Sequence, residues 1–137
     1  MALTHLVDTS VLTRLRHEEV RAALEPRTAA GHVARAGISD LEVGFSARNP
    51  TEWNAFAAAL GTFPLIETDA THLRRARQIQ RLLASRGLRC RKVPDLLIAA
   101  AAEHSGLILL HYDGDFDLIS RVTGQPCQWV VPAGTVD

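Results

Sequence analysis

Cysteine is scarce in this chain of 137 residues, which contains only Cys90 and Cys127. Two cysteines are too few for a disulfide framework, and no Cys-x-x-Cys or Cys/His pairing indicates a zinc site. The longest uninterrupted apolar run, Leu96–Ala102, has seven residues, far short of the roughly 20 that a membrane-spanning helix needs. The start, Met1–Leu6, lacks the basic segment and long apolar stretch of a secretory signal. We therefore expect a cytoplasmic protein without a membrane segment.

Net charge is also absent, because 15 Lys and Arg are balanced by 15 Asp and Glu. This balance removes the simple argument that an overall basic protein binds nucleic acid. The basic residues are nevertheless concentrated, since eight of the fifteen lie within residues 74–92 with no acidic residue among them. We call this group the arginine strip: Arg74, Arg75, Arg77, Arg81, Arg86, Arg89, Arg91 and Lys92. Because the planar guanidinium suits phosphate oxygens, the strip is a candidate phosphate contact, with a solvated helix face as the alternative.

The length and composition predict one folded domain. A chain of this size buries roughly two-thirds of its unfolded surface around a single core. Its 47% hydrophobic and 22% charged residues exclude a disordered chain. No internal repeat, linker or low-complexity stretch divides it. We therefore expect residues 1–137 to form a single domain.

Apolar segments with strand character alternate with helix signals along the chain. The expected strands are residues 3–8, 32–36, 63–66, 107–110 and 128–131. The expected helices are near residues 11–15 and at 18–24, 39–47, 51–60, 68–86, 95–104 and 115–122. Pro26 is expected to end the second helix, and Ser39 with Glu42 has the form of a capping box. The alternation predicts an α/β fold, an open parallel sheet of four to five strands with helices on both faces.

Acidic residues stand where the expected strands meet helices. Asp8 ends the first strand and Asp113 follows the strand at 107–110, so both reach the edge where open parallel sheets bind ligands. Glu42 and Asp95 lie in the first turns of expected helices. They lie near Asp8 and Asp113 if those helix starts face the same edge of the sheet. Two carboxylates about 4 Å apart repel by roughly 4 kcal/mol at an effective dielectric near 20. Such a cluster needs a cation, and oxygen ligands suit Mg²⁺ or Mn²⁺, which points to phosphodiester hydrolysis.

Each acidic residue also has a purely structural interpretation. Asp8 could cap the following helix, and Glu42 could be the second half of the capping box with Ser39. Asp95 could stabilise its helix through its charge in the first turn. The remaining acidic group could be a polar turn before a helix: Asp113, Asp115 and Asp117.

Five segments, in this order, resemble PIN-domain proteins, and more narrowly the VapC-type toxins of bacterial type II toxin–antitoxin modules. The segments are 6–10 (LVDTS), 39–48 (SDLEVGFSAR), 93–100 (VPDLLIAA), 110–116 (LHYDGDF) and 128–132 (QWVVP). Any one of them is weak, whereas the acidic motifs in this order over essentially the whole chain are specific.

The resemblance implies a PIN-like domain and a Mg²⁺- or Mn²⁺-dependent endoribonuclease. Its catalytic and metal-binding acids would be Asp8, Glu42, Asp95 and Asp113, with Asp115 as an auxiliary metal ligand. The resemblance also implies structured RNA such as tRNA or rRNA as substrate, a small VapB-like antitoxin, and a homodimer or toxin–antitoxin hetero-oligomer.

The arginine strip then contacts RNA, antitoxin, a second copy or solvent, and the candidate substrate-binding residues are Arg74, Arg75 and Arg81. One position departs from the family pattern, because relatives often carry Thr or Ser where this chain has His111. We expect His111 to pack or to hydrogen-bond around the site.

Other interpretations of the acidic motifs fit less well. A calcium-binding loop starting at Asp113 needs Gly and Glu where this chain has Leu118 and Gly124. A haloacid-dehalogenase-like phosphatase carries its Asp-x-Asp motif at the start of the fold, whereas here the motif at residues 113–115 lies near the end of the sequence. A receiver-like phosphoacceptor domain needs an acidic neighbour for Asp8 and a lysine after a late strand, whereas Lys92 precedes a helix. A catalytically silent RNA-binding or protein-interaction module stays as an alternative, although it would be free to lose the four acids.

Overall fold

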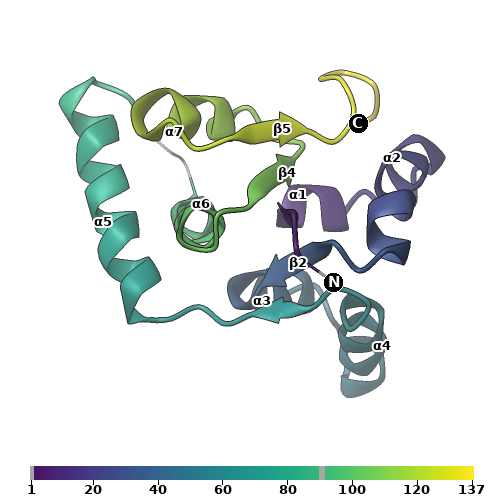
Figure 1. Cartoon of the computed structure of the whole chain (residues 1–137). Helices are drawn as coiled ribbons and strands as arrows, with labels where there is room; N and C mark the ends of the chain where they lie inside the picture. Colours follow the sequence, from purple (N-terminus) through teal and green to yellow (C-terminus); the bar gives the residue numbers. More distant parts are fainter. Residues whose placement is uncertain (1, 90–91) are drawn as a thin grey trace.

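Strands and helices alternate along the chain, as the sequence pattern predicts (Figure 1). The computed structural model describes residues 2–89 and 92–137, so Cys90 and Arg91 lie outside the described residues. The strands are β1 His5–Val7, β2 Val33–Ala36, β3 Leu65–Ile66, β4 Ile108–His111 and β5 Cys127–Trp129. The helices are α1 Thr9–Leu12, α2 Glu18–Ala29, α3 Gly37–Gly44, α4 Pro50–Leu60, α5 Ala70–Ser85, α6 Val93–His104 and α7 Asp115–Thr123.

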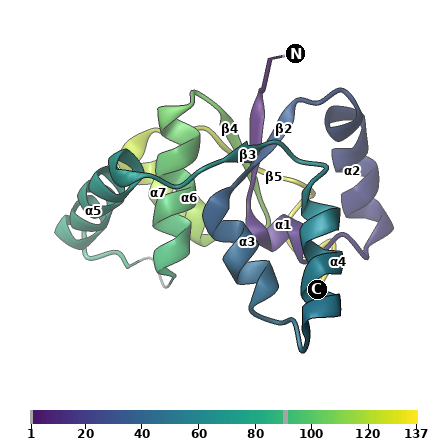
Figure 2. The same ribbon diagram turned by 90° about the horizontal axis from the view of Figure 1, so that it is seen from below.

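The five strands form one parallel sheet in the order β3-β2-β1-β4-β5. Leu6 in the central strand β1 pairs with Ala34 on one side and Leu109 on the other. The chain therefore first builds outward from β1 through β2 and β3, then crosses to the other side of β1 for β4. This reversal of strand order opens a crevice at the carboxyl ends of β1 and β4, the usual ligand position in such sheets. Figure 2 shows α1 and α3 leaving the lower ends of β1 and β2, opposite the N-terminus.

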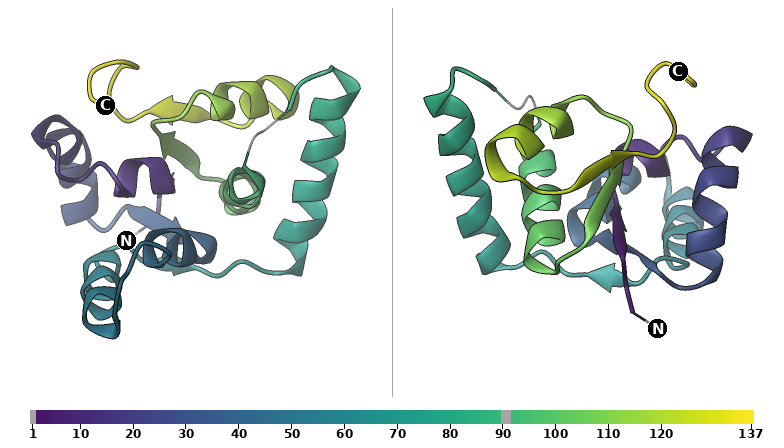
Figure 3. Two further views of the ribbon diagram at one scale, coloured as in Figure 1. Left: turned by 180° about the vertical axis from the view of Figure 1, so that it is seen from behind. Right: turned by 45° about the horizontal axis from the view of Figure 1, so that its top comes forward.

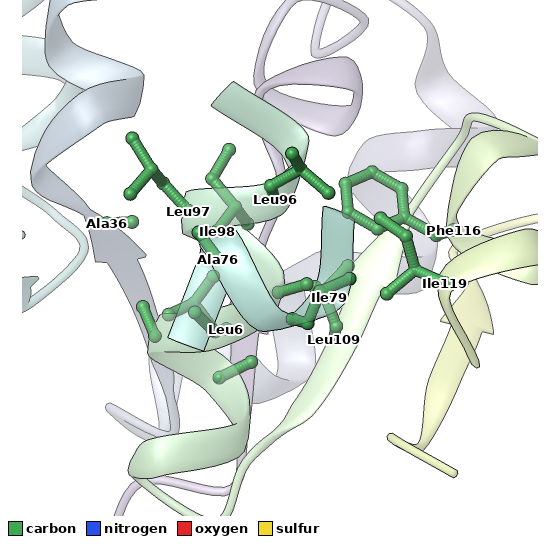
Figure 4. Packing of buried hydrophobic residues seen from close by; sticks show 14 of the residues in the cluster. Leu6, Ala36, Ala76, Ile79, Leu96, Leu97, Ile98, Leu109, Phe116 and Ile119 are labelled. Atoms are coloured by element: carbon green, nitrogen blue, oxygen red, sulfur yellow. The ribbon is translucent and has the colours of Figure 1, made fainter. Parts of the chain in front are cut away.

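Both faces of the sheet are covered by helices, which confirms the predicted fold class. Leu6 and Leu109 belong to a core shared with α5, α6 and α7 (Figure 4). Val7 and Leu110, the next residues along each strand, belong to a second core shared with α1, α2 and α4. Successive side chains of a strand point to opposite faces, so two-sided burial explains why β1 and β4 are apolar throughout.

The apolar run Leu96–Ala102 forms most of α6, which lies between α5 and the sheet in two views (Figures 1 and 3). Every residue of this run is buried, so it is a core helix. No helix among the described residues is both long enough and apolar enough to cross a bilayer.

Pro26 does not end α2, contrary to expectation, because the helix continues to Ala29. Proline fits the helical φ and removes one backbone donor. Side chains of Arg27 and Thr28 donate to backbone carbonyls four residues earlier, at 3.3 and 3.2 Å. Leu24 is buried in the second core, so tertiary packing retains the last turn that local propensity predicts to unwind.

The capping-box expectation for Ser39 and Glu42 is also wrong. Helix α3 begins at Gly37 directly after β2, with Ala36 at the N-cap position and no side-chain cap. Ser39 is therefore inside the helix and fully buried. Glu42 lies one turn into α3 and is free of the capping role that its sequence context suggested.

Replacing Ile79 with Ala should lower the free energy of unfolding by about 2–5 kcal/mol. Ile79 lies on α5 with no exposed surface and fills the core between α5 and the sheet. Urea unfolding measures the change. Leu73→Ala on the same helix is the matched control, because Leu73 is 53% exposed and should change stability by no more than about 0.5 kcal/mol. Equal losses in both variants would contradict the packing described.

Candidate active site

A cleft of about 650 Å³ opens at the carboxyl ends of β1 and β4. It contains all four acids that the sequence analysis singled out: Asp8, Glu42, Asp95 and Asp113. Asp115 joins two of them, because one carboxylate oxygen each from Asp95, Asp113 and Asp115 lies within 4.8 Å of the others. The helix starts of α3 and α6 thus face the same edge as the ends of β1 and β4, the condition that the sequence left open.

Asp8 serves both as a helix cap and as a wall of the cleft. Its Oδ2 accepts a hydrogen bond from the backbone N–H of Ser10 at 2.9 Å, which caps α1. Its Oδ1 is buried and has no hydrogen-bond partner among residues 2–89 and 92–137. Burial raises the pKa of Asp8 to about 6, and the charge of Glu42 acts in the same direction. The cap alone does not explain the buried second oxygen.

Asp95 is 2% exposed in the first turn of α6. Burial raises the pKa of Asp95 to about 8, and the charges of Asp8, Asp113 and Glu42 add to this rise, while Lys92 opposes it. A carboxylate that only complements a helix N-terminus has the opposite shift, because the helix dipole favours its charged form. The raised pKa of Asp95 therefore reflects its burial first and the surrounding acids second, and a role as a helix-terminus charge alone does not account for it.

Glu42 is held at the cleft by hydroxyl groups that the sequence analysis did not identify. The Thr9 hydroxyl donates to Glu42 Oε1 at 2.7 Å and lies 2.8 Å from the Ser39 hydroxyl oxygen. Thr9 directly follows Asp8 in the chain, and this adjacency to an acidic motif was the available signal. Ser39 gave no such signal, because its position suggested a helix cap.

Both carboxylate oxygens of Asp113 accept a hydrogen bond. Oδ1 accepts from the backbone N–H of Asp115 at 3.0 Å, and Oδ2 accepts from Lys92 Nζ at 2.7 Å. Burial alone would raise the pKa of Asp113, but the ammonium and the N–H outweigh burial and lower it. Lys92 belongs to the arginine strip by sequence, whereas the structure places it at the acidic cleft.

His111 is buried and packs beside the site, as expected. Its Nδ1 accepts from the backbone N–H of Asp113 at 3.2 Å. The ring lies 5.1 Å from the Phe116 ring and 5.0 Å from the Trp129 ring, between centroids. Burial lowers the pKa of His111 to about 4, so the imidazole is neutral at pH 7 and supports the loop that carries Asp113.

The C-terminal segment forms another wall of the cleft that the sequence did not predict. The Tyr112 hydroxyl donates to the Val136 carbonyl at 2.7 Å and accepts from the Gly134 and Val136 N–H groups. The Arg14 guanidinium lies 5.0 Å from the centre of the Tyr112 ring. Its Nη1 donates to the Ser10 carbonyl at 2.7 Å. Arg14 is therefore a fixed cation at the cleft wall.

The arginine strip divides into residues with different partners. Arg75, one of the candidate substrate-binding residues, forms an ion pair with Glu103 at 2.6 Å that joins α5 to α6. Arg74, Arg77 and Arg81 are exposed on α5 and line a surface hollow along this helix.

The residues of the cleft fit a hard divalent cation. The donors are carboxylate oxygens, which Mg²⁺ and Mn²⁺ prefer. The buried Asp8 Oδ1 lacks a hydrogen-bond partner among the described residues, and one carboxylate oxygen from each of the three clustered acids lies within 4.8 Å of the others. A divalent charge would also relieve the repulsion that raises the pKa of Asp95.

Comparisons with known proteins identify the family of this fold. The family model of the PIN domain matches residues 5–122. The chain is 64% identical to Ribonuclease VapC51 of Mycobacterium tuberculosis over the full length of both. It is 42% identical to Ribonuclease VapC21 of the same species, over 98% of this chain and 99% of the relative.

Solved structures of toxin–antitoxin complexes share the fold. A DNA-bound VapBC from Salmonella typhimurium superposes with a TM-score of 0.77 at 19% identity, covering 94% of this chain and 99% of that chain. A toxin–antitoxin complex from Klebsiella pneumoniae gives a TM-score of 0.70 at 26% identity, covering 93% and 98%.

Asp95→Asn should remove a pH dependence of stability. The folded protein keeps the Asp95 proton up to about pH 8, whereas the ordinary pKa is 3.8, so the folded state binds more protons between these values. The free energy of unfolding of the wild type should therefore fall as the pH rises from about 4 to about 8. The variant should be more stable by about 1–3 kcal/mol at pH 8 and equal near pH 4.

Urea unfolding in the presence of a chelator, at pH 4.5 and pH 8, measures this difference. Asp69→Asn, which keeps the cap of α5, should retain the wild-type fall. A parallel pH profile for Asp95→Asn and the wild type would contradict the buried, acid-surrounded environment of Asp95.

Proposed function

The chain belongs to the PIN-domain family and to its VapC ribonucleases, and we propose that it is a toxin that cleaves RNA internally with a divalent metal ion. The observation that carries this proposal is the meeting of four acids from four separate segments in one cleft, with Asp115 clustered with two of them. The full-length similarity to ribonucleases gives the substrate class. We propose residues 1–137 as one nuclease domain acting in the cytoplasm, where such RNA is found.

In this proposal the metal ligands are the side chains of Asp8, Glu42, Asp95 and Asp113, with Asp115 as an auxiliary ligand. When bound, Mg²⁺ or Mn²⁺ supplies Lewis acidity that activates water and neutralises charge on the phosphate. The acids that repel one another without a cation become its ligands, and this explains why a marginally stable fold tolerates them.

The chain's own groups have separate tasks in the reaction. Asp8 Oδ1, buried and without a partner among the described residues, is placed to accept a hydrogen bond or the proton of the attacking water. Thr9 holds Glu42 in its orientation, and His111 holds the backbone of Asp113. Attack of water in line with the departing 3′ oxygen leaves a 5′-phosphate and a 3′-hydroxyl.

RNA backbone is the proposed ligand of the outer side of α5. Arg74, Arg77 and Arg81 are exposed there at helical spacing, and the helix carries no acidic residue between Ala70 and Ser85. Among the candidate substrate-binding residues we propose Arg77 instead of Arg75, because the Arg75 side chain forms an ion pair with Glu103.

A VapB-like antitoxin is the proposed protein partner, in a hetero-oligomer or with a homodimer of this chain. The similar structures include toxin–antitoxin complexes. Large apolar side chains are exposed on α3 and the following residues: Leu41 is 68% and Phe45 is 91% exposed. An apolar groove of about 480 Å³ beside them runs from Leu12 to Phe56 and reaches Glu42, so a segment bound there would touch the acidic cleft.

Asp8→Asn and Asp95→Asn should each lower RNA cleavage by at least about 100-fold. The amide removes the negative charge that the metal requires and keeps the shape of the side chain. The measurement is end mapping of total RNA after brief induced expression, followed by cleavage of a mapped substrate in vitro. The matched control is Asp69→Asn, because Asp69 lies outside the cleft and asparagine can still cap α5. This variant should cleave RNA like the wild type. Wild-type turnover in either cleft variant would refute the assignment.

The triple variant Arg74→Gln, Arg77→Gln, Arg81→Gln should bind RNA with a weaker salt dependence. Each lost phosphate contact reduces the slope of log K against log salt by about 0.7 for single strands, so the slope should fall by about 2. Filter binding of the cleaved RNA between 50 and 300 mM KCl, with the additional Asp8→Asn change to prevent hydrolysis, measures it.

A control with the same loss of charge separates contact from net charge. Arg21, Arg48 and Arg121 are exposed elsewhere on the surface, and their combined change to Gln should leave the slope within error of the parent. An unchanged slope in the α5 variant would assign that surface to a protein partner or to solvent.

A further inference from the structure

Lys92 is the single lysine of the chain, and its ammonium is in direct contact with the proposed metal site. Nζ lies 2.7 Å from Asp113 Oδ2. The hydrogen bond to Asp113 raises the pKa of Lys92, and the charges of Asp95, Asp113 and Asp8 act in the same direction. The ammonium therefore lies in the field of three of the proposed ligands and is in contact with a carboxylate oxygen of one of them.

The position of Lys92 allows its ammonium to leave while its backbone stays fixed. Its carbonyl accepts from the N–H of Asp95 at 3.2 Å at the start of α6. Its side chain is 51% exposed, whereas that of Asp113 is 19% exposed, so the flexible four-carbon stem reaches the site from the solvent side. Asp113 keeps its orientation without the ammonium, because Oδ1 also accepts from the N–H of Asp115.

Arg14, the other cation of the cleft wall among the described residues, is not available for such a movement. Arg14 donates through Nη1 to the Ser10 carbonyl and through Nε to the Asp137 carbonyl, both at 2.7 Å. Its guanidinium also lies over the Tyr112 ring. Arg14 thus belongs to the wall, and Lys92 is the cation that contacts the acids.

A polyanionic substrate meets an electrostatic problem at this cleft. When the clustered carboxylates are ionised around a divalent cation, they repel a phosphodiester, because together they carry more negative charge than one such ion carries positive charge. A positive group at the rim that moves from carboxylate to phosphate reduces this repulsion when the substrate arrives.

We propose that Lys92 is a mobile counter-ion. Its ammonium moves away from Asp113 when the divalent cation binds and then contacts the RNA phosphate beside the scissile bond. This inference rests on the proposed function. It makes Lys92 a competitor of the metal and a contact of the substrate, so removal of its charge has opposite effects on the two affinities.

The test measures both affinities for the purified full chain carrying Lys92→Gln. Calorimetry with Mn²⁺ alone should show about tenfold tighter binding than in the wild type, because the competing charge is gone. Anisotropy of a short, 5′-labelled single-stranded RNA in Ca²⁺, with gels showing that the RNA stays intact, should show about tenfold weaker binding. Lys92→Arg keeps the charge and should retain RNA affinity within about threefold.

Arg121→Gln is the control for loss of one positive charge at an exposed position outside the cleft, and both of its affinities should match the wild type. A damaged fold would weaken both affinities of Lys92→Gln, and a purely surface role would change neither. Either result, or a change in only one affinity, overturns the inference. Failure of the proposed function is distinguishable, because the wild type itself would then bind no Mn²⁺ and cleave no RNA.

Discussion

Repulsion among carboxylates at the carboxyl ends of β1 and β4 is the constraint on which the rest of this structure depends. Asp8 and Asp95 are both almost fully buried, and burial together with neighbouring charge raises the pKa of each. Such an arrangement destabilises the folded chain and persists only where the surrounding structure enforces it. In the proposed function a divalent cation offsets this repulsion, and the ribonuclease chemistry follows from placing a phosphodiester beside that cation.

The rigid part of the fold supplies that enforcement. Two apolar cores, one on each face of the sheet, fix β1 and β4 as neighbours. The acids are attached to elements that begin or end at this edge, so they cannot move apart without disturbing a core. Hydrogen bonds from Thr9 to Glu42 and from the Asp113 N–H to His111 set the remaining orientations. Stability is therefore concentrated in the apolar layers, while the cleft carries the unfavourable charge.

Positive charge is distributed in a complementary way, in groups with different freedom. Arg75 is bound to Glu103 and joins two helices, and Arg14 is held by backbone carbonyls at the cleft wall. The exposed arginines of α5 face solvent on the outer side of the molecule. Lys92 alone among the described basic residues combines an exposed stem with a contact to the acidic cluster. A chain with zero net charge thus presents both a basic surface on α5 and an acidic cleft.

The sequence by itself determined the alternation of strands and helices, the parallel sheet, and the delivery of Asp8 and Asp113 to one edge, because these follow from local periodicity and from the direction of parallel strands. It did not determine where α3 begins, that Pro26 lies inside a helix, or that Lys92 reaches Asp113. Those features depend on contacts between segments far apart in the chain, which the packing of helices on the sheet creates. Local signals describe only neighbouring residues, so the joining of Glu42 and Asp95 to the acidic site was decided by the tertiary structure.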